Sequence, residues 1–340
     1  MLLIRSIVAA ALALGITGFA ATASAADACK SRGELDTMYC DSNGDMVADA
    51  PTDSKKWKNP STIVFTYTPV EDPAVYESVF KPFTNHLSSC LNKKVVFYQV
   101  QSNASEIEAM RSGRLHVGGF STGPTAFAVN LAGAVPFAVK GDASGFQGYT
   151  LLLIVKANSP FQKITDLKDK KVAHTSPSSN SGNLAPRALF PALGLTPDKD
   201  YKVIFSGKHD QSVMGVNSGD YDAAAVASDV FHRMAERGQV KESDFRVLYK
   251  SQKFPTSSFA YAHDLEPKLV DKMLTCFYDY RFPPEMKKAF DGADRFFPIN
   301  YKTTWAVVRD VAKGSGGAFD KSSYDKETAR EAAEAAKKKS

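Results

Sequence analysis

From Ser61 onward, short apolar runs alternate with stretches of helical character, and the alternation occurs in two successive series. Apolar runs of this length, bounded by polar turns, are typical of buried strands. The first series predicts strands at 63–67, 95–100, 115–119 and 149–155, with helices at 72–90, 105–112 and from 124. The second predicts strands at 171–174, 201–205, 223–227 and 246–249, with helices at 182–192, 210–217 and 229–237. From 266 to the end we expect mainly helix.

Strands alternating with helices are typical of open, mostly parallel sheets covered by helices on both faces. Two such series predict an α/β protein with two lobes, a cleft between them and a hinge. We assign 61–150 and 257–315 to one lobe and 156–250 to the other, with crossovers near Val155 and Ser251. A polar segment, 26–60, precedes the lobes. A polar helical tail, 316–340, follows them, and we expect it to project into solvent.

The first 25 residues have the order of a secretory signal peptide. Arg5 precedes an apolar run at 7–20, and Ala23-Ser24-Ala25 follows it. The run is shorter than the roughly 20 apolar residues that a membrane span needs. We therefore expect an exported protein without stable membrane insertion, cleaved near Ala26.

The composition of the chain excludes fewer classes of function than its hydrophobic pattern does. The chain has 340 residues, of which 44% are hydrophobic and 23% charged, an ordinary globular balance. At this length two domains are more common than one. A formal net charge of +5 spread over the chain gives no reason to expect nucleic-acid binding.

Polar residues follow nearly every predicted strand. In open α/β sheets, ligands bind beyond the carboxyl ends of the strands. Most of these positions carry hydroxyl or amide groups and lead into a helix, whose first turn has unpaired N–H groups and binds anions. The resulting candidate ligand residues are Tyr67, Thr68, Ser102, Asn103, Ser121, Thr122, Ser179, Asn180, Ser181, Gly182, His209, Asp210 and Asp229.

The densest of these segments is TSPSSNSGNLAPR, residues 175–187. Ser179, Asn180, Ser181 and Gly182 could together surround a tetrahedral oxyanion at a helix N-terminus. The segment lacks G-x-x-x-x-G-K-[ST] and is therefore not a nucleotide-binding P-loop. The alternative is that these residues only cap helices, which is what Ser, Thr and Asn usually do at such positions.

Two carboxylates begin helices in the predicted cleft, Asp210 and Asp229. An ionised Asp repels a bare anion but accepts a hydrogen bond from a protonated ligand oxygen or an amine. The alternative is helix capping with favourable dipole interaction. His209 is adjacent, but neither a nucleophile elbow nor a zinc-ligand spacing accompanies it, so we expect a binding protein and no enzyme.

Four cysteines, Cys29, Cys40, Cys90 and Cys276, suit an oxidising compartment and allow three pairings. The first two are close in sequence, and we expect them to pair. Cys90 and Cys276 lie on predicted helices. They either form a second disulfide between distant parts of the chain or remain as two buried thiols.

The segment CDSNGDMVAD, residues 40–49, resembles a calcium loop in its spacing of oxygen side chains. The candidate ligands are Asp41, Asn43, Asp45 and Asp49. It departs from an EF-hand, because Gly44 comes one position early and Thr52 stands where a Glu would close the loop. A structural calcium is one interpretation, and a solvated acidic linker is the other.

Three longer stretches resemble one known family: TSPSSNSGNLAP, FSGKHDQSVMGVNSGDYDAAAVASD (205–229) and EIEAMRSGRLHVGGFSTGP (106–124). With Gly148-Tyr149 they are similar to the periplasmic phosphonate-, phosphite- and phosphate-binding components of ABC transporters. The resemblance covers roughly 61–310. It implies a type II periplasmic-binding fold and a phosphoryl group held by residues 179–181. It also implies ligand contacts from Tyr149, Asp210 and Asp229.

The resemblance further implies capture of a small phosphorus oxyanion in the periplasm for an ABC transporter permease, with no cofactor required. We expect a monomer. Asn103 replaces an aromatic residue of aminoalkylphosphonate binders, which favours phosphite or phosphate over a long phosphonate. The alternative is an arsenite- or arsenate-type sensor accessory that presents its closed form to a sensor kinase. Ser102 stands where an arsenite site would need a thiol, which disfavours that alternative.

Overall fold

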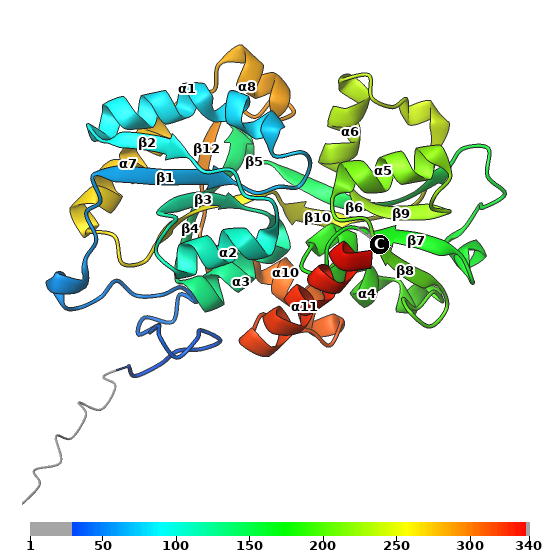
Figure 1. The fold of residues 1–340 in the computed structure, drawn as a ribbon, viewed down its shortest axis with the longest axis horizontal. Coiled ribbons are helices and arrows are strands. Elements are labelled where there is room, and N and C mark those ends of the chain that lie inside the picture. The colour runs from blue at the N-terminus through cyan, green and yellow to red at the C-terminus, as the bar shows by residue number, and fades with distance from the viewer. Residues whose placement is uncertain (1–28, 338–340) are drawn as a thin grey trace, which may run out of the picture.

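The computed structural model describes residues 29–337, and within them two β-sheets lie side by side with helices on both faces of each (Figure 1). The expected signal peptide, 1–25, lies outside the described residues. We refer to the part built on the first sheet as lobe 1 and to the part built on the second as lobe 2. The α/β fold class is confirmed.

Lobe 1 contains a seven-stranded sheet in the order β12-β4-β11-β3-β1-β2, with β5 paired to β4. β1, β2 and β3 are parallel, and β4, β11 and β12 add antiparallel strands. The strands are β1 (Thr62–Tyr67), β2 (Lys94–Phe97), β3 (Val117–Phe120), β4 (Ala134–Asp142), β5 (Gly145–Phe146), β11 (Ser258–Ala262) and β12 (Arg295–Pro298).

The helices of lobe 1 begin close to the predicted positions. Asp72 accepts the N–H of Ala74 at the start of the first one, as expected of a residue that caps a helix. The helices are α1 (Ala74–Leu91), α2 (Asn103–Arg111), α3 (Thr122–Ala132), α7 (Pro267–Asp279), α8 (Pro284–Ala289), α9 (Tyr301–Thr304) and α10 (Ala306–Gly314), with a short 3-10 turn η1 (Ser54–Lys56) before the sheet.

Lobe 2 contains a five-stranded sheet in the order β10-β6-β9-β7-β8. Its strands are β6 (Gly148–Lys156), β7 (Lys171–His174), β8 (Lys202–Phe205), β9 (Ala223–Ala227) and β10 (Phe245–Pro255). Its helices are α4 (Ala185–Leu189), α5 (His209–Ser218) and α6 (Ser228–Glu236). Short turns complete it: η2 (Ile164–Leu167), the π-helical η3 (Asn180–Leu184), η4 (Pro191–Leu193) and η5 (Glu242–Asp244).

The chain crosses between the lobes twice. β6 and β10 pair antiparallel from Gly148–Pro255 to Lys156–Phe245, and both belong to the second sheet. The crossings therefore lie just before Gly148 and just after Pro255, not near Val155 and Ser251 as expected. The sequence pattern places the first crossing too late because it groups 149–155 with the strands of the first series, whereas β6 pairs with β9 and β10 in the second sheet.

The sequence pattern also missed strands. β4 follows Gly133, whose φ of 62° ends α3, but its apolar residues continue the apolar character of that helix. β12 is only four residues long and interrupts a region expected to be helical. Both strands pair antiparallel within the sheet, and their apolar residues do not stand out from the helical stretches beside them.

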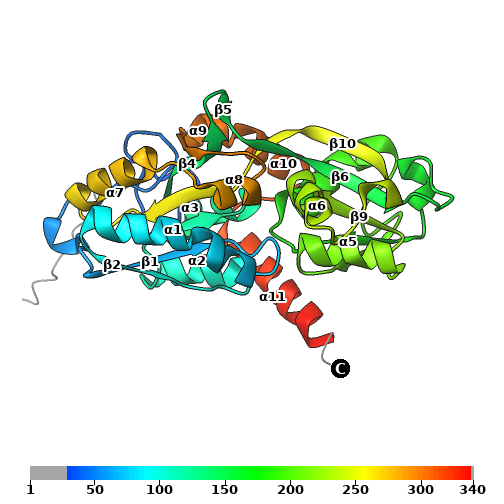
Figure 2. The same ribbon diagram turned by 90° about the horizontal axis from the view of Figure 1, so that it is seen from above.

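The last helix, α11 (Lys321–Lys337), does not project freely as the sequence predicted. The Tyr324 hydroxyl donates to the carbonyl of Ala104 in lobe 1, at 3.0 Å. The Arg330 guanidinium lies 4.6 Å from the centre of the Phe205 ring in lobe 2. α11 therefore lies across the boundary between the lobes (Figure 2). No helix in residues 29–337 is long and apolar enough to span a membrane.

Both disulfides are present. Cys29–Cys40 closes a short loop, as expected, and Cys90–Cys276 joins α1 to α7. The thiol alternative for Cys90 and Cys276 is therefore wrong. Cys90 and Cys276 pack in the core of lobe 1. In this core, Phe83, Phe277 and Phe296 make edge-to-face and tilted ring contacts at 4.7–4.8 Å.

The two disulfides should stabilise the protein unequally. The cross-link between Cys90 and Cys276 spans 186 residues and that between Cys29 and Cys40 spans 11. In the chain-entropy account, the longer loop restricts the unfolded chain more, by about 5 against about 3 kcal/mol. Replacing both cysteines of each pair by serine and measuring denaturant unfolding should therefore show the larger loss for Cys90 and Cys276. An equal loss would contradict this account.

Candidate functional site

A small cavity of about 40 Å³ lies between the lobes, and we call it the inner cavity. A buried water needs roughly 10–15 Å³ on this measure, so the inner cavity has room for one small solute. Its walls consist mostly of hydroxyl, amide and backbone groups. They are formed by Tyr67, Pro69, Val70, Asn103, Ser121, Thr122, Tyr149, Thr175, Ser176, Ser179, Asn180, Gly207, Lys208, His209, Ala227, Asp229, Val230, Thr256 and Ser257.

Helix starts from both lobes meet at the inner cavity. Lobe 1 contributes the first turns of α2 and α3, and lobe 2 contributes those of η3, α5 and α6. The strands before these segments are β2 and β3 in lobe 1, both parallel to β1, and the mutually parallel β7, β8 and β9 in lobe 2, so within each sheet they end on the same side, at the cleft. The N–H groups of a first turn have no partner within their own helix and carry partial positive charge. The cavity is therefore suited to an oxyanion.

The loop before η3 has the arrangement expected of a cradle. The Ser179 hydroxyl accepts the N–H of Gly182 at 3.1 Å, and the Asn180 amide donates to the Tyr149 hydroxyl at 3.2 Å. Gly182 is required here, because a Cβ at this position would lie 1.8 Å from Oγ1 of Thr175. Ser179 thus caps the turn as well as lining the cavity, so capping and ligand binding are not exclusive.

Three side-chain oxygens in the cavity wall have no hydrogen-bond partner among the residues that the structure describes. They are Oγ1 of Thr175, Oδ1 of Asn180 and Oγ1 of Thr256, and all three are buried. Buried polar atoms are nearly always hydrogen-bonded, and leaving one unpaired costs about 1–3 kcal/mol. Three such atoms around one cavity therefore indicate that a polar ligand satisfies them.

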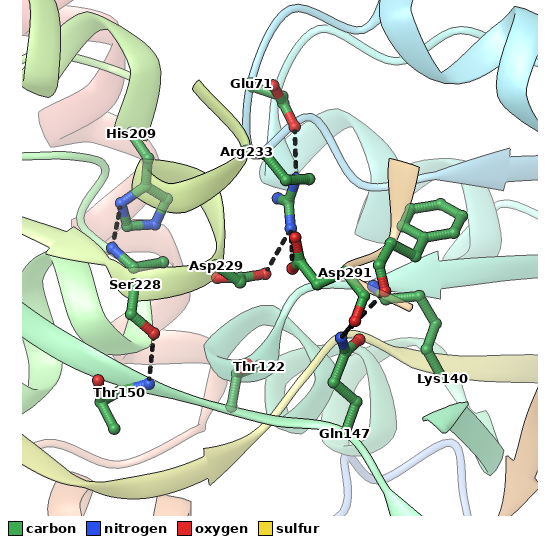
Figure 3. Close-up of polar contacts among 12 residues, drawn as sticks. Glu71, Thr122, Lys140, Gln147, Thr150, His209, Ser228, Asp229, Arg233 and Asp291 are labelled. Atoms are coloured by element: carbon green, nitrogen blue, oxygen red, sulfur yellow. Dashed lines mark hydrogen bonds and ion pairs between the residues drawn. The ribbon is translucent and has the colours of Figure 1, made fainter. Parts of the chain in front are cut away.

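His209 is held as a neutral hydrogen-bond donor. Its Nδ1 accepts the N–H of Ala227 at 3.1 Å (Figure 3), so the single proton of the neutral ring lies on Nε2. Burial lowers the pKa of His209 to about 4, although the nearby Asp229 opposes this effect. Nε2 lies 3.5 Å from the Ser179 hydroxyl and borders the cavity. The ring therefore offers one N–H to a ligand without adding a charge.

Asp229 stays ionised in the cavity wall. Burial alone would raise its pKa, but the charges of Arg233 and Lys140 outweigh burial and hold the pKa below the ordinary value. Arg233 Nη1 lies 3.0 Å from Asp229 on the same helix, α6. The cavity thus contains an ionised carboxylate that accepts but does not donate hydrogen bonds.

The same guanidinium joins the two lobes (Figure 3). Arg233 of lobe 2 contacts Asp291 of lobe 1 at 3.1 Å and Glu71 of lobe 1 at 3.4 Å. Arg237 also pairs with Glu71, which in addition accepts the Tyr76 hydroxyl at 2.8 Å. Arg233 and Glu71 are almost fully buried, so separating the lobes would leave these groups to be solvated by water instead of each other.

A buried lysine lies behind the lobe 1 wall of the cavity. The Lys140 ammonium is almost inaccessible to solvent and donates to the Tyr67 hydroxyl oxygen. It also lies 4.6 Å from the centre of the Phe290 ring. Because Lys140 occupies the phenol oxygen as a donor, the phenol proton of Tyr67 can be directed at another acceptor. Lys140 therefore adds positive charge near the site without lining it.

The lobes are in close contact around the cavity. The N–H of His209 donates to the carbonyl of Val70 across the cleft at 3.2 Å. Gly123, at the start of α3, lies so close to lobe 2 that a Cβ would be 2.1 Å from the Ser178 carbonyl oxygen. This conformation is therefore a closed one, and Gly123 permits the lobes to approach.

The structure brings nine of the fourteen candidate ligand residues together around the inner cavity. They are Tyr67, Asn103, Ser121, Thr122, Tyr149, Ser179, Asn180, His209 and Asp229. The remaining five, Thr68, Ser102, Ser181, Gly182 and Asp210, do not line it.

These five residues have other positions. Thr68 donates to Oδ1 of Asn103 from behind, and Ser102 caps α2. Ser181 is buried beside the cradle, and its hydroxyl oxygen has no hydrogen-bond partner among the described residues. Asp210 lies beside a different surface depression together with Met214 and Met234. The ligand contact expected of Asp210 therefore does not fit its position, because the first turn of α5 directs His209, and not its neighbour, at the cavity.

Sequence analysis missed several lining residues. Lys208 is the one lysine or arginine in the described wall, and it stands in the SGKHD stretch beside His209. Thr175 and Ser176 open the TSPSSNSG segment. Thr256 and Ser257 follow β10 and precede another strand, so no helix start marked them.

The proposed calcium ligands use their oxygens within the loop. Asp41 accepts the N–H groups of Asp45 and Met46 at 3.0 and 3.1 Å, and Asp49 accepts that of Ser42 at 2.8 Å. Asn43 Oδ1 also accepts the Asp45 N–H, at 2.9 Å. Within residues 29–337, no group of three or more His, Cys, Asp or Glu is placed to hold a metal ion. Structural calcium in this loop stays a prediction.

Two lobes that close on a polar cavity define a solute-binding protein, and comparison with known proteins agrees. Residues 65–303 match the family model described as "ABC transporter, phosphonate, periplasmic substrate-binding protein". The chain belongs to this family.

A curated relative, the phosphate-import protein PhnD of Mycolicibacterium smegmatis, is 30% identical over 68% of this chain and 75% of its own. The solved structure of PhnD1 from Prochlorococcus marinus with methylphosphonate has a TM-score of 0.68 at 19% identity, covering 76% of this chain and all of that one. A phosphonate-transporter binding protein from Pseudomonas aeruginosa has a TM-score of 0.67 at 20% identity, covering 82% and 99%. These structural likenesses confirm the two-lobed periplasmic-binding fold.

The buried state of His209 predicts a specific pH dependence of stability. The pKa is about 4 in the folded protein and near 6.5 when unfolded, so the unfolded chain binds the extra proton first. Stability from the neutral ring is fully present above pH 6.5 and is lost as the pH falls towards 4. Between pH 6.5 and 4, the free energy of unfolding of wild type should fall by about 3 kcal/mol more than that of a His209→Gln variant. The measurement is denaturant unfolding without added anions.

The matched control is His232→Gln, which alters an exposed histidine on α6 that pairs with Glu242. It should change the pH dependence much less. If the His209→Gln protein and wild type lose stability in parallel between pH 6.5 and 4, His209 is not held neutral by burial.

Gly123 predicts an effect on closure. In a Gly123→Ala protein the new methyl group meets the Ser178 backbone, so the lobes cannot reach the conformation described above. Ligand affinity should fall at least tenfold, and X-ray scattering with ligand should show a larger radius of gyration than for wild type. The control is Gly314→Ala, where the nearest atom to the Cβ is 3.7 Å away. Wild-type affinity and compactness of the Gly123→Ala protein would contradict this account.

Proposed function

We propose that this protein captures a small phosphorus oxyanion (phosphate, phosphite or a small phosphonate) in the inner cavity and delivers it to an ABC transporter permease. The observation that carries the proposal is the convergence of five helix starts on a closed cavity with unpartnered hydroxyl and amide groups. Membership of the phosphonate-binding family supports it. So does the relative that is named a phosphate-import protein.

The charge of the wall favours a protonated oxyanion. An ionised Asp229 would repel a fully deprotonated oxygen, but it accepts a hydrogen bond from a P–OH group. Phosphate carries such a proton near neutral pH, and phosphite and methylphosphonate carry one in their monoanionic forms, whereas sulfate does not. We infer that the cavity selects phosphorus oxyanions against sulfate because Asp229 has nothing to accept from sulfate.

The hydrogen-bond donors are numerous enough for useful affinity. Hydrogen bonds to a charged group contribute about 1.5–3 kcal/mol each, and a micromolar complex requires about 8 kcal/mol. The hydroxyls of Thr175 and Thr256, the Nε2–H of His209 and the ammonium of Lys208 border the cavity, in addition to the backbone N–H groups. A handful of these contacts is sufficient after ordering costs.

Hydrolysis is the rival activity, since Ser179 and His209 lie 3.5 Å apart. A serine nucleophile needs a histidine that can accept its proton, with a carboxylate or carbonyl acceptor on the other ring nitrogen. Here the other nitrogen, Nδ1, accepts the N–H of Ala227, so Nε2 already carries the proton. The pair is arranged to donate to a ligand and not to activate a nucleophile.

The arsenite sensor alternative would need a cysteine thiol at the inner cavity. All four cysteines form disulfides within the described chain, and none lines the inner cavity. Family membership supports delivery to a permease, and the closed form would present both lobes to it in a fixed relation.

The proposal is tested by calorimetry with phosphate, phosphite, methylphosphonate and sulfate at pH 7. The phosphorus oxyanions should bind with micromolar or tighter affinity, and sulfate at least one hundredfold more weakly. Asn180→Ala should weaken phosphate binding at least tenfold, because it removes a donor and an acceptor from the wall.

The matched control is Ser218→Ala, at the far end of α5 from the cavity. It should bind like wild type. Equal affinity for sulfate and phosphate would reject the role of Asp229, and the absence of binding to every phosphorus oxyanion would reject the function.

A further inference from the structure

A second, larger cavity adjoins the inner one. We call it the outer cavity; its volume is about 410 Å³, against about 40 Å³ for the inner cavity. It lies between the lobes on the side where α11 crosses their boundary, and Thr328 and Ala332 of α11 form part of its wall. Its other lining residues are Pro69, Gln101, Ser102, Asn103, Ala104, Thr175, Ser176, Pro177, Phe205, Ser206, Gly207, Lys208 and Gln211.

The two cavities share part of their walls. Asn103 of lobe 1 and Ser176 of lobe 2 line both, and Nδ2 of Asn103 lies 3.3 Å from Oγ of Ser176. Pro69, Thr175, Gly207 and Lys208 also line both cavities, but Asn103 and Ser176 are the two whose side chains join across the lobes at this shared boundary. Asn103 and Ser176 therefore form a partition, and it is complete only when the lobes are closed.

The Asn103 side chain is held in this orientation by lobe 1. Its Oδ1 accepts the Thr68 hydroxyl at 3.0 Å and the Ser121 hydroxyl at 3.3 Å. Two donors on the oxygen fix which end of the amide points to lobe 2, since Nδ2 cannot accept from a hydroxyl. The buried Thr68, which does not touch the inner cavity, thus has the function of positioning Asn103.

We propose that the Asn103–Ser176 partition sets the size of ligand this protein accepts. The inner cavity holds the tetrahedral group alone, and a substituent of two or more carbons on phosphorus has no room unless the partition is open. The outer cavity has ten times the volume and is lined there by Pro177, Phe205 and Ala332. An alkyl chain on phosphorus would be compatible with this surface. The partition, and not the outer cavity, therefore excludes such a ligand.

This proposal rests on the proposed function and narrows its substrate class to oxyanions without a long substituent. The inner cavity excludes substituents of two or more carbons by volume, and the cost of opening the partition adds to this. A ligand that displaced the Asn103 amide would leave the Thr68 and Ser121 hydroxyls without their acceptor. The protein thus discriminates against long substituents both by their volume and by the hydrogen bonds that they would break.

The test compares phosphate with n-propylphosphonate by calorimetry, in wild type and in an Asn103→Ala protein. Asn103 also lines the inner cavity, so phosphate affinity is expected to change as well, and the ratio of the two affinities is the quantity that matters. Wild type should prefer phosphate by at least one hundredfold. Asn103→Ala should shift the ratio towards n-propylphosphonate at least tenfold, because it joins the two cavities.

Two further variants make the result specific. Ser176→Gly removes the other half of the partition and should shift the ratio in the same direction, which covers the case that Asn103→Ala fails to fold. Gln101→Ala enlarges the outer cavity but leaves the partition intact, and it should keep the wild-type ratio.

Comparable binding of both ligands by wild type would overturn the partition proposal, as would an unchanged ratio in both partition variants. Either result leaves the proposed function standing, because phosphate still binds. If wild type binds neither phosphate, phosphite nor methylphosphonate, the proposed function fails and the partition proposal fails with it.

Discussion

The central constraint on this structure is that an oxyanion taken out of water must receive hydrogen bonds on all its oxygens from groups that are already in place. Burying an anion without such partners is prohibitively costly. Helix first turns provide the partners, because their N–H groups are unpaired and aligned with the helix dipole. One helix gives only one direction of approach. Two lobes, each with parallel strands that lead into several helix starts, surround the solute from both sides once they close.

Closure therefore requires contacts of its own beside the site. The Arg233 guanidinium lies between Asp229 of its own helix and Glu71 and Asp291 of the other lobe. The same group that joins the lobes also keeps Asp229 ionised, so the closed state and the charge of the cavity are linked. Buried ion pairs of this kind add less to stability than to the choice of one arrangement over others. In this protein, that arrangement is the closed position of one lobe on the other.

The hydrogen bonds of the wall also suit the site to binding. Ser179 could have been a nucleophile and His209 its base. Both are already in hydrogen bonds that direct their protons at the cavity. The backbone N–H of Ala227 fixes the His209 tautomer, and the Gly182 N–H binds the Ser179 hydroxyl. Backbone groups thus set the chemistry of side chains that have a catalytic role in other proteins.

The sequence by itself determined the strand–helix order, the helix starts that carry Ser179 and His209, and the Cys29–Cys40 pairing, because these depend on local periodicity, capping and short separation. It missed β4 and β12, whose apolar residues do not stand out from the helical stretches beside them, and it expected from Asp210 a ligand contact that only the neighbouring His209 is placed to make. Lys140, Arg233 and the Asn103–Ser176 contact were decided only by the tertiary structure. Each depends on which residues from distant segments meet when the lobes close, and no local signal in the chain specifies that.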